Sequence, residues 1–269
     1  MIFIANLIKS IVIGFIEGIT EWLPISSAAH LLLFNSICSI YPSEFFEIFK
    51  VFIQFGSIIA VLVLYQSKLN PFISSNRMKQ RQSVQLWLKI IIGCIPACFF
   101  GFLLDDFVES NFVIAVALIF YGVIFILIEK KPRKTRIDTI HKIDYFTSLK
   151  IGFFQCLALI PGTSRSTASI LGGLSCGCSR YVASEFSFFI AIPVMIEKSV
   201  LKMVEYFRYV GFFSFSQLIL LIFGTLISLF VSVLVIQMFL NYIRKHDFKI
   251  FGIYRILLGL FVILYFYIF

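Results

Sequence analysis

Two glutamates, Glu17 and Glu21, lie four residues apart in an apolar stretch near the start of the chain. At this spacing both carboxylates share one helix face, where they repel each other unless one is protonated or a cation bridges them. Burying an ionisable group inside a bilayer costs about 2.5–3.5 kcal/mol even on a lenient scale, so such residues usually mark functional sites. Because carboxylates plus substrate phosphates suit Mg²⁺, and oxygen ligands also suit Ca²⁺, we predict that this pair binds one of these divalent cations. The alternative is one protonated glutamate with hydrogen bonds only to protein.

A chain break follows directly after the second glutamate. Pro24 interrupts the helix, and Ser26, Ser27 and His30 come next. If a helix restarts here, Ser27 and His30 are i, i+3 neighbours, which places a hydroxyl beside an imidazole. This pattern predicts Ser27 as nucleophile and His30 as base, with Ser26 contacting phosphate. A helix cap and a structural histidine are the alternative interpretation.

A second break, at 161–167, has the sequence Pro-Gly-Thr-Ser-Arg-Ser-Thr. A helix that begins here would present free N–H groups and its positive dipole end, which together form an anion site. We predict a phosphate cradle of Thr163, Ser164, Arg165 and Ser166, in which the guanidinium grips phosphate oxygens. The alternative is that the arginine neutralises one of the two glutamates, and the two states can alternate.

The composition indicates the environment of these residues. Of 269 residues, 60% are apolar, 17% aromatic and 14% charged. A soluble domain averages about 45–50% apolar and about 25% charged residues, so the chain is predicted to be an integral membrane protein. Apolar runs leave no room for a separate soluble domain, and 1–269 is expected to be one membrane domain. The net charge of +9 therefore indicates topology rather than a nucleic-acid partner. Six cysteines lack the spacing of a zinc site or disulfide framework and are expected to be free.

The apolar runs predict an all-α polytopic fold. Two apolar regions, 1–38 and 146–180, are broken at the two polar motifs and are expected to form re-entrant helix pairs. The six expected transmembrane helices lie near 47–66, 86–104, 112–129, 184–203, 217–240 and 251–269.

The loops carry a strong charge asymmetry. Loops 67–89, 130–150 and 241–250 hold 15 of the 23 basic residues, whereas the alternate loops hold only Arg208. The positive-inside rule then predicts that the basic loops are cytoplasmic and that both termini lie outside. The alternate loops are 25–46, 104–111 and 204–216.

An internal repeat relates the two broken regions. Residues 14–17 read Gly-Phe-Ile-Glu, and residues 152–155 read Gly-Phe-Phe-Gln, an offset of 138. Each half, about 1–135 and about 140–269, holds one broken region and three spans. Because three is odd, the halves are predicted to have inverted topology, so that their polar breaks meet near the midplane.

These motifs, taken in order, closely resemble the bacterial undecaprenyl-diphosphatase family, the bacitracin-resistance type of membrane phosphatase. The resemblance covers essentially the full chain and implies conversion of a polyprenyl diphosphate lipid, undecaprenyl diphosphate, to undecaprenyl phosphate for peptidoglycan synthesis. It also implies the bacterial cytoplasmic (inner) membrane, a divalent cation, and six spans with two re-entrant pairs in inverted repeat. The matching segments begin at Glu17, Phe52, Pro161 and Ser179.

Four positions depart from the family pattern, one of them Ser169, which stands where the family usually has threonine. Ala28 and Ala29 stand where the family usually has Thr-Gly, and Lys50 replaces a frequent glutamate. Because Glu17, Glu21, Ser27, His30 and Arg165 are intact, we expect activity, with rate or metal preference open to change.

Several alternatives remain open from the sequence. A polyprenyl-phosphate transporter or flippase would use the same inverted-repeat site, but it needs no nucleophile beside a base. His30 could instead be the nucleophile or a general acid for a metal-bound water. The type-2 phosphatidic acid phosphatase class is disfavoured because its Pro-Ser-Gly-His element is missing. A homodimer is left open.

Overall fold

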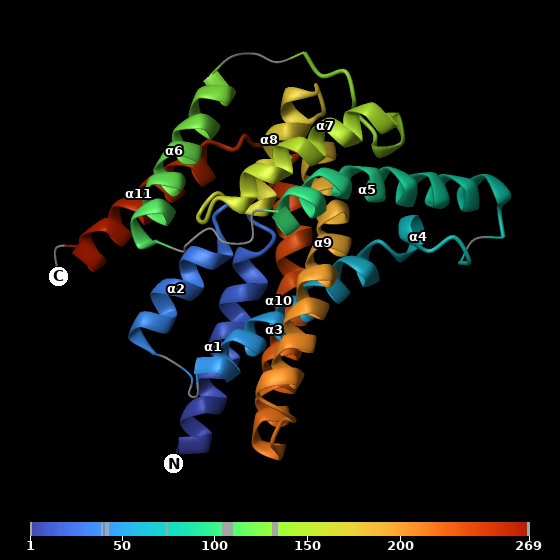
Figure 1. The fold of residues 1–269 in the computed structure, drawn as a ribbon. Coiled ribbons are helices and arrows are strands. Elements are labelled where there is room, and N and C mark those ends of the chain that lie inside the picture. Colours follow the sequence, from blue (N-terminus) through green and yellow to red (C-terminus); the bar gives the residue numbers. More distant parts are fainter. Residues whose placement is uncertain are drawn as a thin grey trace.

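The computed structural model describes residues 2–38, 40, 43–73, 75–103, 110–130 and 134–267. It is 83% helical, and the described residues contain no strand, which confirms the all-α prediction (Figure 1). The α-helices are α1 Ile2–Thr20, α2 Ser27–Ile37, α3 Ser43–Leu64, α4 Gln66–Leu69, α5 Arg77–Leu103, α6 Asn111–Lys130, α7 Tyr145–Gln155, α8 Arg165–Ser175, α9 Arg180–Tyr209, α10 Phe215–Ile243 and α11 Lys249–Tyr267. Two short 3₁₀ helices, Ile140–Lys142 and Cys156–Leu159, flank α7.

Six described helices are long and apolar enough to cross a membrane, as predicted in number. They are α1, α3, α5, α6, α10 and α11, so the set contains α1 in place of the expected span at 184–203. That segment lies within the 30-residue α9, which carries several charges, among them Glu185, Glu197 and Lys198. The re-entrant character of the two broken regions stays a prediction, because length and composition alone allow α1 to span.

Some sequence predictions fall on residues outside the description. These are most of the loop 104–111, Lys131 and Arg133 of a basic loop, and the last two residues of the expected span 251–269. All six cysteines lie among the described residues, and each of them is a free thiol.

Each broken region packs against the opposite half of the chain through one close contact between glycines. A Cβ on Gly14 of α1 would overlap the Gly224 carbonyl oxygen of α10, and a Cβ on Gly152 of α7 would overlap the Gly93 carbonyl oxygen of α5. The helices can approach this closely only because both partners lack side chains. The two contacts are counterparts, since Gly14 and Gly152 are the glycines of the predicted repeat.

Serines one turn before these glycines repeat the arrangement. The Ser10 hydroxyl of α1 donates to the Leu220 carbonyl of α10 at 2.7 Å. The Ser148 hydroxyl of α7 donates to the Lys89 carbonyl of α5. Ser10 and Ser148 are again separated by the repeat offset, so the same pair of contacts occurs once in each direction between the halves.

The contact between α6 and α11 is reciprocal. A Cβ on Gly122 would lie 2.7 Å from the Gly252 carbonyl oxygen, and a Cβ on Gly252 would lie 2.7 Å from the Gly122 carbonyl oxygen. The two helices therefore cross at a pair of glycines, where their backbones can approach closely. Inversion of the halves relative to a bilayer stays a prediction.

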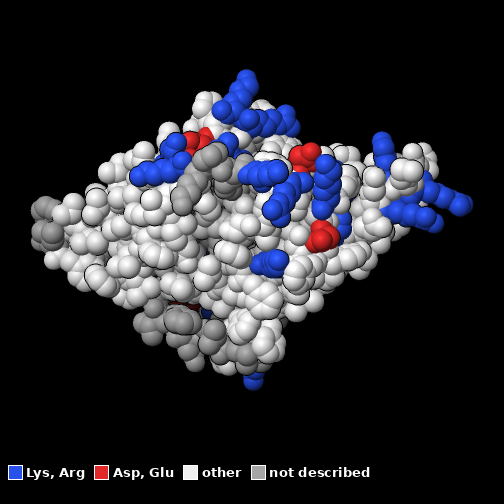
Figure 2. Space-filling model, turned by 90° about the horizontal axis from the view of Figure 1, so that it is seen from above, with Lys and Arg blue, Asp and Glu red and all other residues white. Residues whose placement is uncertain are grey.

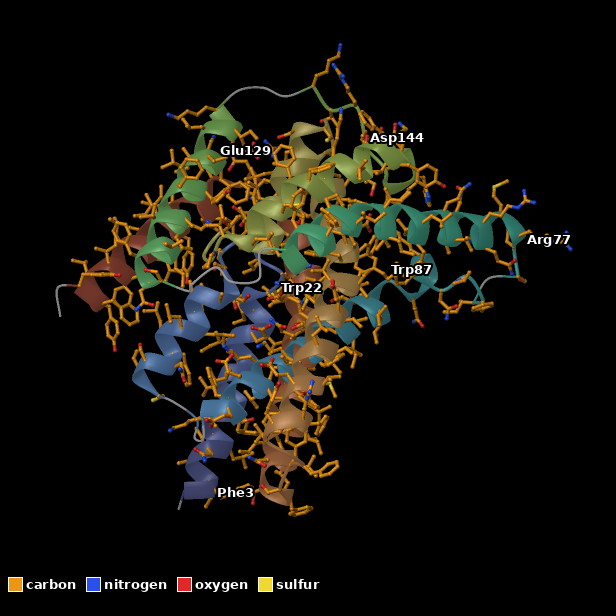
Figure 3. The ribbon with its side chains drawn as sticks, in the orientation of Figure 1. Phe3, Trp22, Arg77, Trp87, Glu129 and Asp144 are labelled. Atoms are coloured by element: carbon orange, nitrogen blue, oxygen red, sulfur yellow. The ribbon has the colours of Figure 1, made fainter. Side chains whose placement is uncertain are left out.

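Charged and apolar side chains occupy different parts of the molecular surface. Lysine and arginine side chains gather on the face seen from above Figure 1, as Figure 2 shows. Elsewhere large apolar side chains face outward along α6, α10 and α11, as expected for helices surrounded by lipid. Trp22 lies near the middle of the molecule, between Phe3 at one end and Arg77 at another (Figure 3).

Candidate active site

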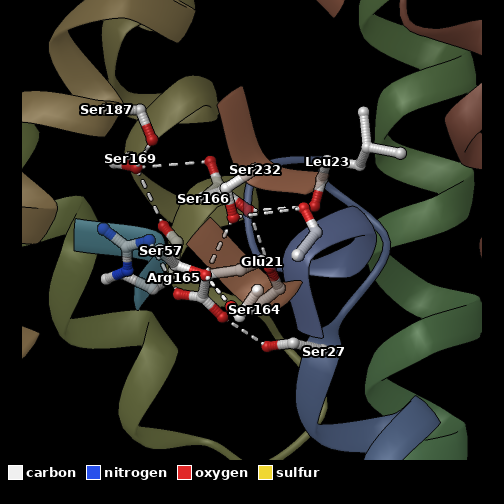
Figure 4. A network of polar contacts seen from close by, with 12 residues as sticks. Glu21, Leu23, Ser27, Ser57, Ser164, Arg165, Ser166, Ser169, Ser187 and Ser232 are labelled. Carbon is white, nitrogen blue, oxygen red and sulfur yellow. Dashed lines mark hydrogen bonds and ion pairs between the residues drawn. The ribbon is translucent and has the colours of Figure 1, made fainter. Parts of the chain in front are cut away.

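The two helix breaks meet inside the molecule, as their polar sequences predict. The first break is the turn between α1 and α2, and the second is the turn that leads into α8. The Thr167 hydroxyl donates to the Pro24 carbonyl at 3.3 Å. The Ser166 hydroxyl donates to the Leu23 carbonyl at 3.3 Å, as Figure 4 shows. Side chains at the start of α8 therefore satisfy carbonyl groups that the first break frees from its helix.

Each break contains one serine in the left-handed backbone region. Ser26 has φ 73° and Ser164 has φ 69°, and each is the N-cap of the following helix. This conformation is uncommon for residues with a side chain and persists where the surroundings enforce it, often at functional sites. The two serines are 138 residues apart, so the strained turn occurs at the same place in both halves.

Glu21 lies at the centre of the site. It accepts a hydrogen bond from the Ser27 hydroxyl at 2.7 Å and an ion-paired hydrogen bond from Arg165 Nη2 at 3.0 Å (Figure 4). The exposed fractions of the Glu21 and Arg165 side chains are 8% and 13%. The alternative in which Arg165 neutralises a glutamate is therefore the arrangement in this structure.

The Arg165 guanidinium retains a free donor. Its Nη1 is buried and has no hydrogen-bond partner among the described residues. Its Cζ lies 5.7 Å from the Trp22 ring centroid, within the range of a cation–π contact that fixes the plane of the group. One edge of the guanidinium thus holds Glu21, while Nη1 remains available for an anion.

His30 does not contact Ser27 as predicted. Its Nδ1 lies 2.7 Å from the Ser26 carbonyl oxygen, and its Nε2 lies 2.7 Å from the Tyr254 hydroxyl. Since a carbonyl only accepts, Nδ1 carries the proton, and Nε2 accepts from the tyrosine. Ser27 is the first residue of α2, and its side chain turns back to the preceding break and to Glu21. The expected hydroxyl–imidazole pair is thus a hydroxyl–carboxylate pair.

Glu17 is fully buried one turn before Glu21, and the Glu21 N–H donates to the Glu17 carbonyl at 3.0 Å. Neither oxygen of the Glu17 carboxylate has a hydrogen-bond partner among the described residues. A buried carboxylate without partners fits a cation beside it. No group of three or more His, Cys, Asp or Glu side chains suited to a metal occurs in the described part of the chain. The two carboxylates, Glu17 and Glu21, are oxygen donors of the kind that Mg²⁺ or Ca²⁺ binds together with substrate phosphate.

The predicted cradle residues surround the start of α8. The hydroxyls of Ser164 and Ser166 lie 2.9 Å apart, and the buried Thr163 hydroxyl has no hydrogen-bond partner among the residues that the structure describes. Ser164 and Ser166 lie beside Glu21 in Figure 4, and the first N–H groups of a helix such as α8 have no acceptor within the helix. The structure thus brings together the predicted catalytic, phosphate-binding and metal-binding residues, with His30 at the edge.

The departures from the family pattern lie at different distances from this network, and Ser169 belongs to it, since its hydroxyl donates to the Arg165 carbonyl at 2.8 Å (Figure 4). Ala29 is buried in a cluster with residues of α6 and α11. Lys50 forms an ion pair with Glu47 at 2.7 Å and lies 5.3 Å from the Phe46 ring centroid. The Ala29 N–H donates to the Ser26 hydroxyl of the first break at 3.4 Å, whereas neither contact of Lys50 involves a residue of the two breaks.

Two residues of α11 were missed by the sequence reasoning. Tyr254 bonds His30, and Arg255 is completely buried with hydrogen bonds to both breaks. An arginine inside the predicted span 251–269 is itself a signal, because charges at bilayer depth are expensive and usually functional. Glu129 and Glu185 are also buried, so the charges inside the molecule are not limited to Glu17, Glu21 and Arg165 at the breaks.

Comparisons with known proteins agree with this site. Residues 10–261 match the family described as bacitracin resistance protein BacA. A protein of Clostridioides difficile (strain 630) named undecaprenyl-diphosphatase 1 is 46% identical over 269 residues, which cover 98% of this chain and 97% of that protein.

Other relatives extend this result. The undecaprenyl-diphosphatase of Streptococcus thermophilus is 44% identical, with 98% of this chain and 94% of that protein covered. The undecaprenyl-diphosphatase of Enterococcus faecalis is 44% identical, with 97% and 98% covered. Because the match spans nearly the whole chain and includes both helix breaks, the protein belongs to the bacitracin resistance protein BacA family of membrane proteins.

Proposed function

We propose that the protein is a membrane phosphatase that hydrolyses undecaprenyl diphosphate to undecaprenyl phosphate and inorganic phosphate. The observation that carries the proposal is the joint contact of Glu21 with the Ser27 hydroxyl and the Arg165 guanidinium, at 2.7 and 3.0 Å. A hydroxyl, a proton acceptor and a cation in one buried place are the parts that phosphoryl transfer needs. The names of the relatives supply the substrate.

In the first step, the Ser27 oxygen attacks the terminal phosphorus and the bond from that phosphorus to the bridging oxygen breaks. The serine proton passes to Glu21, and undecaprenyl phosphate leaves with the bridging oxygen. Arg165 exchanges its bond to the carboxylate for bonds to phosphate oxygens and neutralises their charge. Glu21 takes the role expected of His30 because it already accepts the serine hydrogen bond.

In the second step, water attacks the phosphoserine. Glu21 returns the proton to the Ser27 oxygen as its bond to phosphorus breaks, the water loses its proton to the departing phosphate, and inorganic phosphate is released. The hydroxyls and N–H groups at the start of α8 hold the phosphate through both steps. His30 fixes the turn that carries Ser26 by donating to its carbonyl, and the Tyr254 hydroxyl holds His30 in place through the other ring nitrogen.

The divalent cation expected from the sequence belongs to this proposal. Glu17 and Glu21 would hold it, since the Glu17 carboxylate is buried and has no partner among the described residues. Such a cation would supply further neutralisation of the diphosphate charge.

Phosphate release from a polyprenyl diphosphate by purified protein tests the proposal. We expect release by the wild type, a loss with a chelator, and a decrease of at least about 100-fold for Glu21→Gln and Arg165→Ala. The exposed pair Lys202–Glu205 offers a control, since Glu205→Gln leaves the breaks untouched. No release by the wild type would exclude the phosphatase and favour the flippase alternative, and full activity of Arg165→Ala would exclude its role as phosphate clamp.

We also infer that the protein lies in the bacterial cytoplasmic membrane with both termini outside. The gathering of lysine and arginine on one face supports this orientation (Figure 2). Ser27 belongs to the half expected to enter from outside, so the site opens outward, where diphosphate carrier is released. A homodimer stays a prediction.

A further inference from the structure

Arg255 is a completely buried arginine in the middle of α11. Its guanidinium forms four hydrogen bonds, and every acceptor belongs to one of the two breaks. Nη1 donates to the Pro24 carbonyl at 3.3 Å and to the Thr167 hydroxyl at 2.8 Å. Nη2 donates to the Gly162 and Thr163 carbonyls at 2.9 and 3.1 Å. One side chain therefore connects the turn of the first half to the turn of the second.

All four acceptors are neutral. Two other arginines do have carboxylate partners: Arg165 is paired with Glu21, and Arg180 is paired with Glu129. Among the described residues Arg255 has no such partner, and the Tyr121 ring, 6.0 Å from its Cζ, is its aromatic neighbour. An arginine used only for packing would gain from a carboxylate, because an unpaired charge at this depth is costly. Its charge is thus left to act on the adjacent phosphate cradle.

The second break needs an external constraint of this kind. Gly162 has φ 88° and Ser164 has φ 69°, with Thr163 between them. A Cβ on Gly162 would lie 2.5 Å from the Ile114 carbonyl oxygen, so the turn is also pressed against α6. The guanidinium binds the carbonyls of Gly162 and Thr163 together, which fixes the direction of the following hydroxyls and of the first N–H groups of α8. Its planar fork can do this for both breaks, whereas an ammonium is a point charge.

We propose that Arg255 is the positioning residue of the diphosphate site. It sets the spacing of the two breaks, and its unpaired positive charge raises the affinity for phosphate without touching it. The proposal rests on the proposed function and deepens it. It predicts two separable effects of substitution. Loss of the planar fork misplaces the breaks and lowers kcat, and loss of the positive charge weakens phosphate binding and raises KM.

Three substitutions separate these effects. Arg255→Met removes fork and charge, and we expect kcat/KM to fall about 100-fold, since misplacement by about 1 Å costs that much. Arg255→Lys keeps the charge, so we expect KM to stay near the wild-type value while kcat falls. Arg255→Ala leaves a cavity, and added guanidinium ion should restore activity several-fold. Arg180→Ala, which removes an arginine that is paired with Glu129 away from the breaks, should show no recovery with guanidinium and little change in kcat.

A direct readout of the turn complements the kinetics. Trp22 and Trp87 are the two tryptophans, so Trp87→Phe leaves Trp22, which lies against Arg165, as the single fluorophore. In that background we expect pyrophosphate to change the Trp22 emission, with weaker binding for Arg255→Met than for Arg255→Lys. This titration distinguishes the two proposals, because pyrophosphate binding does not require that the wild type hydrolyse lipid.

Unchanged kcat/KM and pyrophosphate affinity in Arg255→Met would overturn the inference. The role of Arg255 would be purely structural if three results coincide. The lysine and methionine variants would show the same fall in kcat and the same rise in KM, both would have a lower melting temperature, and guanidinium would restore no activity. If Arg255→Ala does not fold, the lysine variant decides through its split between kcat and KM.

Discussion

At the residue scale, Ser27 has one hydrogen-bond acceptor where the sequence offers two candidates. His30 is three residues away along α2, but its ring nitrogens bond the Ser26 carbonyl and the Tyr254 hydroxyl. Glu21 is six residues away across the break and accepts from Ser27 at 2.7 Å. Helical spacing predicts which side chains of one helix can share a face. It does not predict contacts across a helix break, where the first residue of the new helix can turn its side chain back to the preceding helix.

Alanine variants of α2 test this assignment. We expect Ser27→Ala to lower kcat by at least about 1000-fold, and His30→Ala by about tenfold, because only the first removes the nucleophile. Phosphate release under saturating substrate gives both values. Ser36→Ala is the matched control, since this exposed serine of the same helix donates only to the Leu33 carbonyl. Equal losses for Ser27→Ala and His30→Ala would restore the serine–histidine pair.

The residues that could be predicted at this scale are those that stand out against their surroundings. Carboxylates in an apolar run and an arginine among hydroxyls identify both breaks. Arg255 meets the same criterion but was not selected, because it has no polar motif around it. Its partners are mostly backbone carbonyls, which no pattern of side-chain types reveals.

At the element scale, close contacts of glycines determine which helices pair. Gly14→Ala would place a methyl group against the Gly224 carbonyl, so α1 must move away from α10. We expect a loss of about 1–3 kcal/mol in unfolding free energy, as for other overpacked contacts. Gly101→Ala is the control, because its Cβ would lie 3.7 Å from the Leu159 side chain, an ordinary contact, and helix propensity favours it. Thermal unfolding in detergent compares them, and equal stability of the two variants would contradict close α1–α10 packing.

The start of α7 gives a second prediction at this scale. Asp144 is its N-cap and accepts from the Thr147 N–H at 2.6 Å, which holds the pKa of this carboxyl below its ordinary value of 3.8. A lowered pKa means that the cap is fully effective above pH 3.8 and is lost as the pH falls through the folded-state value. We expect Asp144→Asn to keep part of the cap, and Asp144→Ala to cost about 1 kcal/mol at neutral pH. The difference should shrink in acid, and a cost independent of pH would contradict the charge contribution.

The extents of the elements were predicted well because apolar runs end where charges begin. The expected span 112–129 lies inside α6, and 217–240 lies inside α10. The partners of these helices were not predictable in the same way. Contacts between α1 and α10, or α7 and α5, depend on glycines that look alike in sequence wherever they fall. Only the repeat offset of Gly14 and Gly152 hinted that the two contacts are counterparts.

At the scale of the whole molecule, the repeat explains why the site is asymmetric. The break of the first half contributes Glu21 and Ser27, whereas the counterpart of Ser27 in the second half is Arg165, 138 residues later. The strained serines remain at equivalent places in both halves. One half therefore supplies the groups that move protons, and the other supplies the groups that hold an anion. The two breaks meet through the hydrogen bonds of the Ser166 and Thr167 hydroxyls to the Leu23 and Pro24 carbonyls.

The predicted orientation gives a test for the whole chain. In a background with the six cysteines replaced, single cysteines at the exposed positions Arg77, Lys134 and Lys245 sample the three basic loops, and one at Phe212 samples an alternate loop. Because basic loops stay in the cytoplasm, we expect a membrane-impermeant maleimide added to intact cells to label only the Phe212 position. Permeabilised cells should show labelling at all four, which controls for accessibility. Labelling of any basic-loop position in intact cells would reverse the orientation, place Ser27 in the half that enters from the cytoplasm, and turn the site to the inner face.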